Sequence, residues 1–168
     1  MKRILRWAGV AVLGLAVIAG VVYATRTNPI AMVAGRQLTG TVVSEPVTNW
    51  DFTDDHQLIA IETRPAAPHS VTTVCFTHEG ALYVPAQGGA AKSWPHYVVS
   101  DPRVRVKIGD EIYPAVATRV TDASLQPALI ASAAEKYDFE LPQGPDALED
   151  VWVFRIESAP AEVGAGRP

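Results

Sequence analysis

The chain has 168 residues, of which 48% are hydrophobic and 19% are charged, and its formal net charge is −4. This composition is typical of a folded globular protein and excludes an intrinsically disordered chain. The basic residues form no cluster large enough to indicate a nucleic-acid partner. Cys75 is the only cysteine, which excludes an intrachain disulfide and a thiolate metal site. Its apolar neighbours Val74 and Phe76 predict a buried, unreactive thiol.

The first predicted element is a membrane anchor over residues 1–24. Residues 7–24 (WAGVAVLGLAVIAGVVYA) carry no charge, and as a helix they would extend roughly 27 Å, enough to cross a thin bilayer. Three basic residues precede this stretch and one, Arg26, follows it. This bias predicts a single-pass protein with a cytoplasmic N-terminus. The rest of the chain is then extracytoplasmic, either periplasmic or extracellular.

A cleaved signal peptide is the alternative for the same segment. Val22-Tyr23-Ala24 resembles a small-x-small cleavage site. The apolar run is longer than the core of about 7–15 residues that signal peptides have, and Tyr23 suits an anchor at the membrane interface. The anchor is therefore the preferred interpretation, and both alternatives place the folded part outside the cytoplasm.

One domain is predicted over residues 37–157, after a linker at 25–36 and before a disordered tail at 158–168. Short runs rich in β-branched and aromatic residues predict its strands. The first four such runs are 37–44, 58–63, 70–77 and 81–86. The turn signal His78-Glu79-Gly80 joins the last two runs into a hairpin.

A second hairpin over residues 103–120 has the clearest pattern. Val104, Val106 and Ile108 alternate with three basic residues, Arg103, Arg105 and Lys107. This alternation predicts a strand whose basic side chains face solvent. Gly109-Asp110 is a two-residue turn that starts with a positive-φ glycine. Pro114 in the return strand predicts an edge or a bulge, because proline cannot donate to a ladder.

One long helix is predicted at 122–136, with Asp122 as its cap and apolar residues at helical spacing. A loop follows at 138–150, and the strand 151–157 (VWVFRIE) closes the fold. Six or seven strands with one or two helices predict a mainly-β fold. A small antiparallel barrel is favoured, because closing the sheet removes exposed edges.

The loop at 87–93 (QGGAAKS) is the best candidate for a binding site. Its glycines allow the backbone to approach a ligand, and it leads into a short predicted helix at 94–99. Lys92 and Ser93 would lie at the helix N-terminus, where amide groups and the helix dipole favour an anion such as phosphate. An ordinary flexible loop is the alternative, because the spacing matches neither a Walker motif nor a dinucleotide motif.

Other chemistries find less support in the sequence. Arg64, His69 and Ser70 flank the preceding strands and could add donors to a phosphate site. The four histidines form no short ligand pair, so no metal site is predicted. The Gly-x-Ser-x-Gly elbow of serine hydrolases does not occur, and no catalytic residue is assigned.

Residues 58–157 resemble the split-barrel flavin-binding superfamily, which includes pyridoxamine-phosphate-oxidase-like proteins and deazaflavin-dependent nitroreductases. The stretch 81–122 (ALYVPAQGGAAKSWPHYVVSDPRVRVKIGDEIYPAVATRVTD) carries the resemblance. It has the family's order of a hairpin strand, a small-residue loop with a lysine, a short Trp-containing helix, an Asn/Asp-Pro-x-Val turn and a hairpin. Lys92 matches the loop lysine, and Gly109 matches the hairpin glycine.

The resemblance implies a split β-barrel that binds FMN or a deazaflavin between the two subunits of a homodimer. It implies an oxidoreductase that acts on a small molecule, with these cofactor-binding residues: Arg64, Ser70, Lys92, Ser93 and Trp94. The family's Gly-Arg-Lys-Ser-Gly-like turn is replaced here by residues 64–70 (RPAAPHS). A non-catalytic extracytoplasmic binding or assembly module on the same barrel is therefore the alternative.

Overall fold

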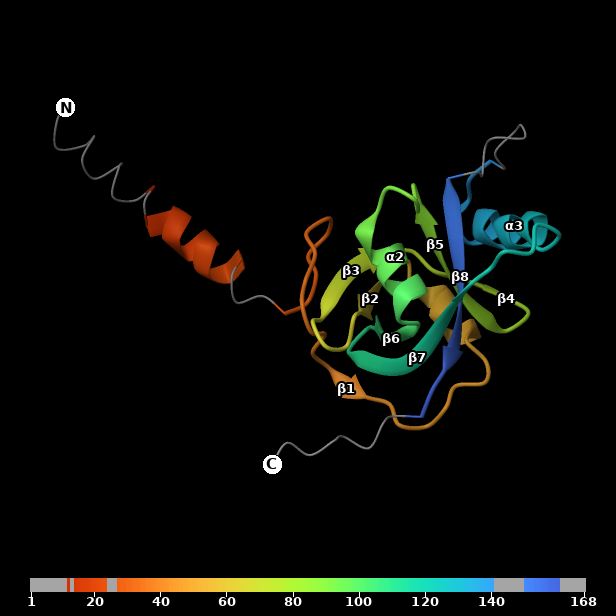
Figure 1. Ribbon diagram of the computed structural model, residues 1–168, viewed down its shortest axis with the longest axis horizontal. Helices are drawn as coiled ribbons and strands as arrows, with labels where there is room; N and C mark the ends of the chain where they lie inside the picture. Colours follow the sequence, from red (N-terminus) through yellow and green to blue (C-terminus); the bar gives the residue numbers. More distant parts are fainter. Residues whose placement is uncertain (1–11, 13, 24–26, 141–149, 161–168) are drawn as a thin grey trace.

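The computed structural model describes residues 12, 14–23, 27–140 and 150–160, and these residues form mainly β-strands (Figure 1). The strands are β1 (Thr41–Val42), β2 (Ile59–Thr63), β3 (His69–Thr73), β4 (Phe76–His78), β5 (Ala81–Gln87), β6 (Arg103–Ile108), β7 (Glu111–Arg119) and β8 (Val151–Ser158). The helices that follow the N-terminal segment are the 3-10 helix η1 (Asp51–Asp55), α2 (Ser93–Ser100) and α3 (Gln126–Tyr137).

Residues 14–23 are helical, and their side chains are exposed. Among the described residues, no helix has both the length and the hydrophobicity needed to cross a membrane. Residues 1–11, 13 and 24 of the predicted anchor lie outside the described residues. Residues 141–149 of the predicted loop and 161–168 of the predicted tail also lie outside them.

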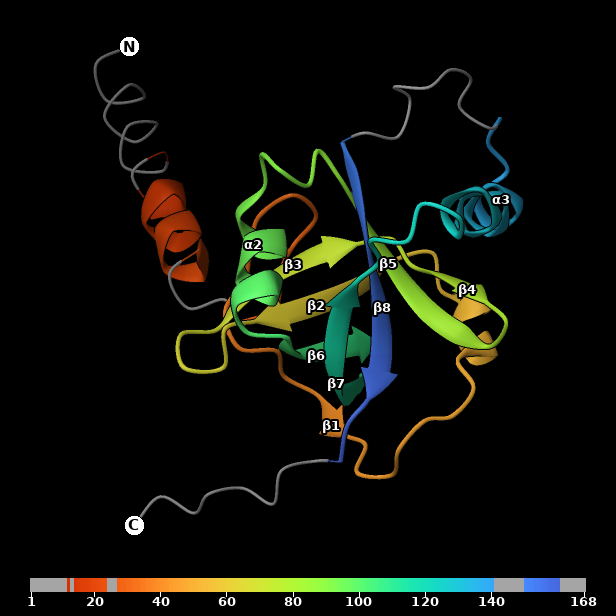
Figure 2. The same ribbon diagram turned by 45° about the vertical axis from the view of Figure 1, so that its right-hand side comes forward.

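The strands form one curled sheet in the order β3-β2-β6-β7-β8-β5-β4. Neighbours along this path are antiparallel, as predicted, whereas the short β1 runs parallel to the start of β7. Figure 2 shows the sheet curving around its interior. The edge strands β3 and β4 are not paired with each other within the described residues. The barrel is therefore split, and the Thr73 hydroxyl donates across the opening to the Pro85 carbonyl at 3.4 Å.

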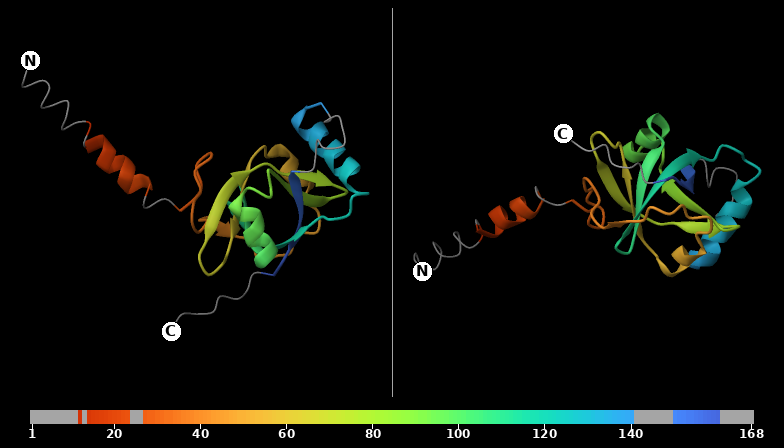
Figure 3. Two further views of the ribbon diagram at one scale, coloured as in Figure 1. Left: turned by 45° about the horizontal axis from the view of Figure 1, so that its top comes forward. Right: turned by 90° about the horizontal axis from the view of Figure 1, so that it is seen from below.

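The two faces of the sheet have different cores. Alternate side chains of β5 and β8 point inward, where Val84 and Phe154 pack with Trp94 and Val98 of α2. The intervening residues point outward, where Tyr83 and Val153 pack against α3. Figure 3 accordingly shows α2 and α3 on different sides of the curled sheet. Cys75 is fully buried, as predicted, and burial raises the pKa of its thiol.

Both predicted hairpins are confirmed. Glu79 and Gly80 join β4 to β5 with φ values of 51° and 75°. Gly109 has a φ of 58° and, with Asp110, joins β6 to β7. The predicted strand at 70–77 is interrupted at Val74 and Cys75, so that β3 and β4 pair with different neighbours.

Pro114 does not lie in an edge strand, because β7 pairs with β6 on one side and with β1 and then β8 on the other. The β1 pairing ends at Ile112, and the β8 pairing begins at Ala115. The Pro114 carbonyl accepts from the Ala159 amide at 2.9 Å on this second side. The Pro114 nitrogen, which has no hydrogen to donate, faces this same side of β7. It lies in the gap between β1 and β8, so no hydrogen bond of a strand pair is lost there.

The prediction that the basic face of β6 is solvated is wrong for Arg105 and Lys107. Arg105 donates both to the Glu62 carboxylate and to the Leu38 carbonyl, and Lys107 donates to the Thr39 carbonyl at 2.6 Å. These side chains hold residues 38 and 39 against β6. The predicted strand at 37–44 is shorter in the structure, where Thr41 and Val42 form β1.

The long helix begins later than predicted, at Gln126, and Asp122 is not its cap. The Asp122 carboxylate instead accepts from the amide and hydroxyl of Ser124, at 2.9 and 2.7 Å. This local turn competes with helix formation over the first residues. The helix ends at Tyr137, and Asp138 follows in a left-handed conformation.

Candidate functional site

The N-terminus of α2 carries three of the predicted site residues. Lys92 is its N-cap, and Ser93 and Trp94 are its first two residues. No side chain of the described residues caps this end, and the first amides of a helix have no partner within the helix. They favour an anion together with the helix dipole. Trp94 is only 5% exposed and packs on Phe154, with ring centroids 5.5 Å apart, so it supports the helix from beneath.

The loop that presents Lys92 is fixed on the partly buried side chain of Trp152. A Cβ on Gly89 would lie 2.4 Å from Cγ of Trp152, so this close approach requires glycine. The Gly89 amide donates to the Asp150 carbonyl at 2.8 Å. From α2, His96 Nε2 lies 3.0 Å from the Ala90 carbonyl. These contacts hold the loop and the helix start in one arrangement.

Lys92, Ser93 and Trp94 line one cavity of about 500 Å³. Its other walls come from β3 and from residues 31–34. The side chain of His69 also lines it. Burial, and then the charge of Arg64, lower the pKa of His69. At neutral pH His69 is therefore an uncharged imidazole that can donate or accept a hydrogen bond.

Arg64 and Ser70, the other two predicted site residues, do not line this cavity. The Arg64 guanidinium carbon lies 4.1 Å from the ring centroid of Tyr97 in α2. Ser70 is 0% exposed. Arg64 Nε and Ser70 Oγ are both buried without a hydrogen-bond partner among the described residues. The structure therefore brings Lys92, Ser93 and Trp94 together, places Arg64 beside Tyr97 of α2 and leaves Ser70 buried outside the cavity.

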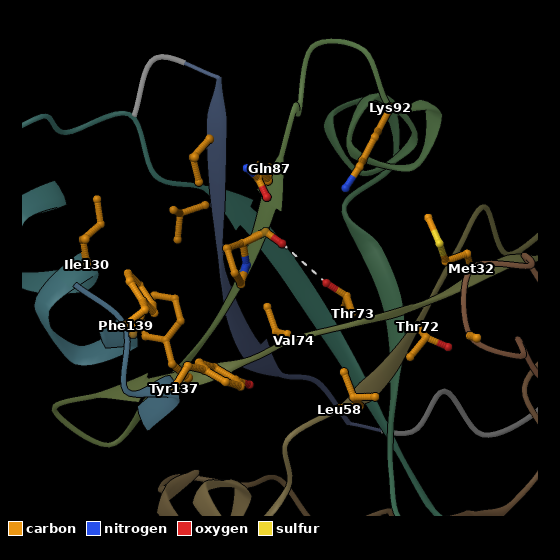
Figure 4. A pocket seen from close by; sticks show the side chains of 16 residues that line it. Met32, Leu58, Thr72, Thr73, Val74, Gln87, Lys92, Ile130, Tyr137 and Phe139 are labelled. Carbon is orange, nitrogen blue, oxygen red and sulfur yellow. Dashed lines mark hydrogen bonds between the residues drawn. The ribbon is translucent and has the colours of Figure 1, made fainter. Parts of the chain in front are cut away.

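A larger cavity of about 670 Å³ adjoins the first one at the opening of the barrel (Figure 4). Its walls are mostly apolar and come from β5, β8, α3 and the β3–β4 connection. Lys92 lines both cavities. Its amino group points into the space between Gln87 and Thr73 (Figure 4). Among the described residues that line either cavity, none is acidic, so the arrangement suits an anionic group attached to an apolar body.

Comparisons with solved structures identify the fold. A proposed pyridoxamine 5'-phosphate oxidase from Listeria innocua is 22% identical, with a TM-score of 0.50 over 62% of this chain and 86% of that one. The heme storage protein HutZ from Vibrio cholerae is 17% identical, with a TM-score of 0.51 over 66% and 87%. A proposed 5-nitroimidazole antibiotic resistance protein from Bacteroides thetaiotaomicron is 10% identical, with a TM-score of 0.51 over 74% and 87%.

The fold is the split β-barrel that these solved structures share. No family model and no curated protein sequence matches the chain.

In this split barrel, the sequence pattern gave no signal for the wall that α3 contributes. Ile130, Tyr137 and Phe139 line the larger cavity from this side. The Tyr137 hydroxyl accepts from the Cys75 amide at 3.1 Å and lies 2.8 Å from the Gln57 carbonyl. The end of α3 is thereby attached to the barrel, which gives the cavity a fixed wall. Residues 57 and 75 are far from Tyr137 in the sequence, so these contacts could not be predicted from local sequence patterns.

Proposed function

We propose that this split barrel is a membrane-anchored, oxidoreductase-like protein that binds FMN or a deazaflavin and acts on a small molecule. The position of Lys92 carries the proposal. Among the described residues it is the one charged residue that lines the larger cavity, and it also lines the cavity at the N-terminus of α2. A volume of about 670 Å³ lies within the usual range of small-molecule sites.

The residues present fit a phosphate-bearing cofactor. Lys92 and Ser93, with the first amides of α2, would hold the phosphate, because a charge-assisted hydrogen bond is among the stronger ones. Trp94 would support them from beneath. Arg64 and Ser70 are proposed as further donors, and this role is supported because Arg64 Nε and Ser70 Oγ have no hydrogen-bond partner within the described part of the chain. The bound cofactor would supply the electron transfer, while the protein binds it, orients it and excludes water.

The Lys92→Ala variant is expected to weaken cofactor binding by about 10- to 150-fold. A charge-assisted contact contributes roughly 1.5–3 kcal/mol, which converts to about that factor. The exposed lysine should contribute little to stability, so the fold should persist. The measurement is a fluorescence titration of the purified full chain in detergent with FMN and, separately, with a deazaflavin.

The matched control is Arg155→Ala, which removes one positive charge from an exposed position of β8 outside both cavities. It should leave the affinity within about twofold, because an exposed distant charge is screened by salt. If the Lys92→Ala variant binds as tightly as the parent, the site is wrong. If neither cofactor binds at concentrations up to a millimolar, the non-catalytic binding or assembly module becomes the better interpretation.

The proposal includes an extracytoplasmic domain, which the charges around the apolar segment support. A reporter that is active only outside the cytoplasm, fused after Pro168, is expected to be active. An expressed but inactive fusion would contradict this topology.

We also propose a homodimer, as the family resemblance implies. The measurement is sedimentation of the full chain, and a strict monomer would contradict the proposal.

A further inference from the structure

Residues 30–33, here called the apolar turn, expose four successive apolar side chains: Ile30, Ala31, Met32 and Val33. The amides of Ile30 and Val33 each donate to the other residue's carbonyl, at 3.1 and 2.9 Å. Met32 is 101% exposed at the tip. An exposed apolar cluster on a folded domain usually marks a contact surface.

The apolar turn is held in place by its flanks. The Gly35 amide donates to the Ser70 carbonyl at 2.8 Å, and the Arg36 amide donates to the Thr27 carbonyl at 2.7 Å. The Asn28 side chain accepts from the Thr39 amide at 3.0 Å. These bonds tie the turn to β3 and to the segment that Arg105 and Lys107 hold. Its apolar side chains are therefore presented outward by a fixed part of the barrel.

A short segment connects the apolar helix at 14–23 to the apolar turn. Tyr23 and Ile30 are seven peptide steps apart, which reach at most about 25 Å in any conformation. Leu15, Ile18 and Val22 of this helix are exposed. A bilayer that receives the helix therefore has its surface within reach of the turn.

The charge of this segment suits a phospholipid surface. Residues 27–36 contain Arg36 and no acidic residue, although acidic residues outnumber basic ones in the whole chain. The charged residue that lines a cavity with residues 31–34, Lys92, is also basic, so no negative charge among the described residues of that wall faces the turn. Basic residues next to a membrane segment are attracted to anionic headgroups.

We propose that the apolar turn inserts into the lipid interface beside the N-terminal helix and so gives the folded domain a second contact with the same bilayer. This inference rests on the membrane anchoring in the proposed function. Apolar side chains enter the boundary between headgroups and acyl chains, while the exposed Arg36 remains among the headgroups. The barrel is then held in one orientation, with the cavities that Met32 lines next to the membrane surface.

The test places a fluorescent probe on Met32→Cys in the full chain, with Cys75→Ala removing the buried native thiol. The protein is incorporated into vesicles of phosphatidylcholine and phosphatidylglycerol. Doxyl groups near the top of the acyl chains should quench the probe, and its emission should shift to the blue. The same probe on Glu79→Cys, in the exposed β4–β5 turn on the opposite side of the barrel (Figures 1 and 2), should show neither change.

A further variant separates insertion from mere proximity. Ile30→Asp combined with Val33→Asp should abolish the quenching of the probe at position 32, while the protein still floats with the vesicles. If the parent floats but the probe at position 32 responds like the probe at position 79, the apolar turn does not insert and this inference is overturned. If the parent does not float, the anchoring itself fails, and with it this inference.

Discussion

The Glu62→Ala variant is expected to lose about 3–5 kcal/mol of unfolding free energy, the cost of leaving one member of a buried ion pair without its partner. Glu62 is 4% exposed. Both of its carboxylate oxygens accept from Arg105 Nη1 at 3.1 Å, and Oε2 also accepts from the Leu38 amide. Its removal would strand the Arg105 charge and the Leu38 amide together, which urea unfolding of the full chain in detergent would measure.

The control for this prediction is Glu157→Ala. Glu157 pairs with Arg155 at 3.5 Å, and both side chains are about half exposed. Such exposed pairs contribute only about 0–1 kcal/mol. A loss below about 1 kcal/mol in Glu62→Ala, comparable with that of Glu157→Ala, would show that the buried cluster does not hold the segment before β1. Replacing both Glu62 and Arg105 by methionine should cost less than Glu62→Ala, because no charge is left unpaired.

Phe154→Ala is the second substitution with a large expected effect, also about 3–5 kcal/mol, because it leaves a cavity in a packed core. Phe154 is 0% exposed and lies in β8, where its ring supports Trp94 of α2. The loss of unfolding free energy should therefore exceed the cost of transferring the removed ring atoms to water. The substitution should also loosen α2, the helix that carries Lys92. Urea unfolding measures the first effect, and hydrogen exchange at the amides of α2 measures the second.

Phe52→Ala provides the matched control, since it deletes the same side chain at a position that is 43% exposed. Its ring stacks on Trp50 with centroids 5.9 Å apart, so a loss of about 1 kcal/mol is expected for the smaller area removed from water. Equal losses in the two variants would contradict the assignment of Phe154 to the centre of the core.

The elements that local sequence chemistry determines were predicted well. The turns at Glu79-Gly80 and Gly109-Asp110 contain residues with left-handed backbone conformation. Glycine adopts this conformation readily, so Gly80 and Gly109 allow the turns to be predicted from the sequence. The environments of Arg105 and Lys107 could not be predicted in the same way. Their partners, Leu38 and Thr39, are 67 and 68 residues away. An alternating pattern predicts which side chains share one face of the strand, but it does not predict which segment packs against that face.

The candidate site likewise contains residues that could be predicted from the sequence and residues that could not. Lys92 and Ser93 were predicted because the loop and the helix start are adjacent in sequence. Ser70 was proposed beside His69, but successive residues of a strand point to opposite faces. His69 lines the cavity, whereas Ser70 is buried. The walls from α3 and from the apolar turn come from distant parts of the chain, and their sequences carry no mark of the shared cavity.

The position of β8 in the sheet determines when the two parts of the barrel can join during synthesis. β8 is the last strand among the described residues, yet it lies between β7 and β5. Without it, the sheet separates into two fragments, β3-β2-β6-β7 and β5-β4. The two fragments precede β8 in the sequence and cannot join until β8 has been synthesised, so neither fragment can close the barrel on its own.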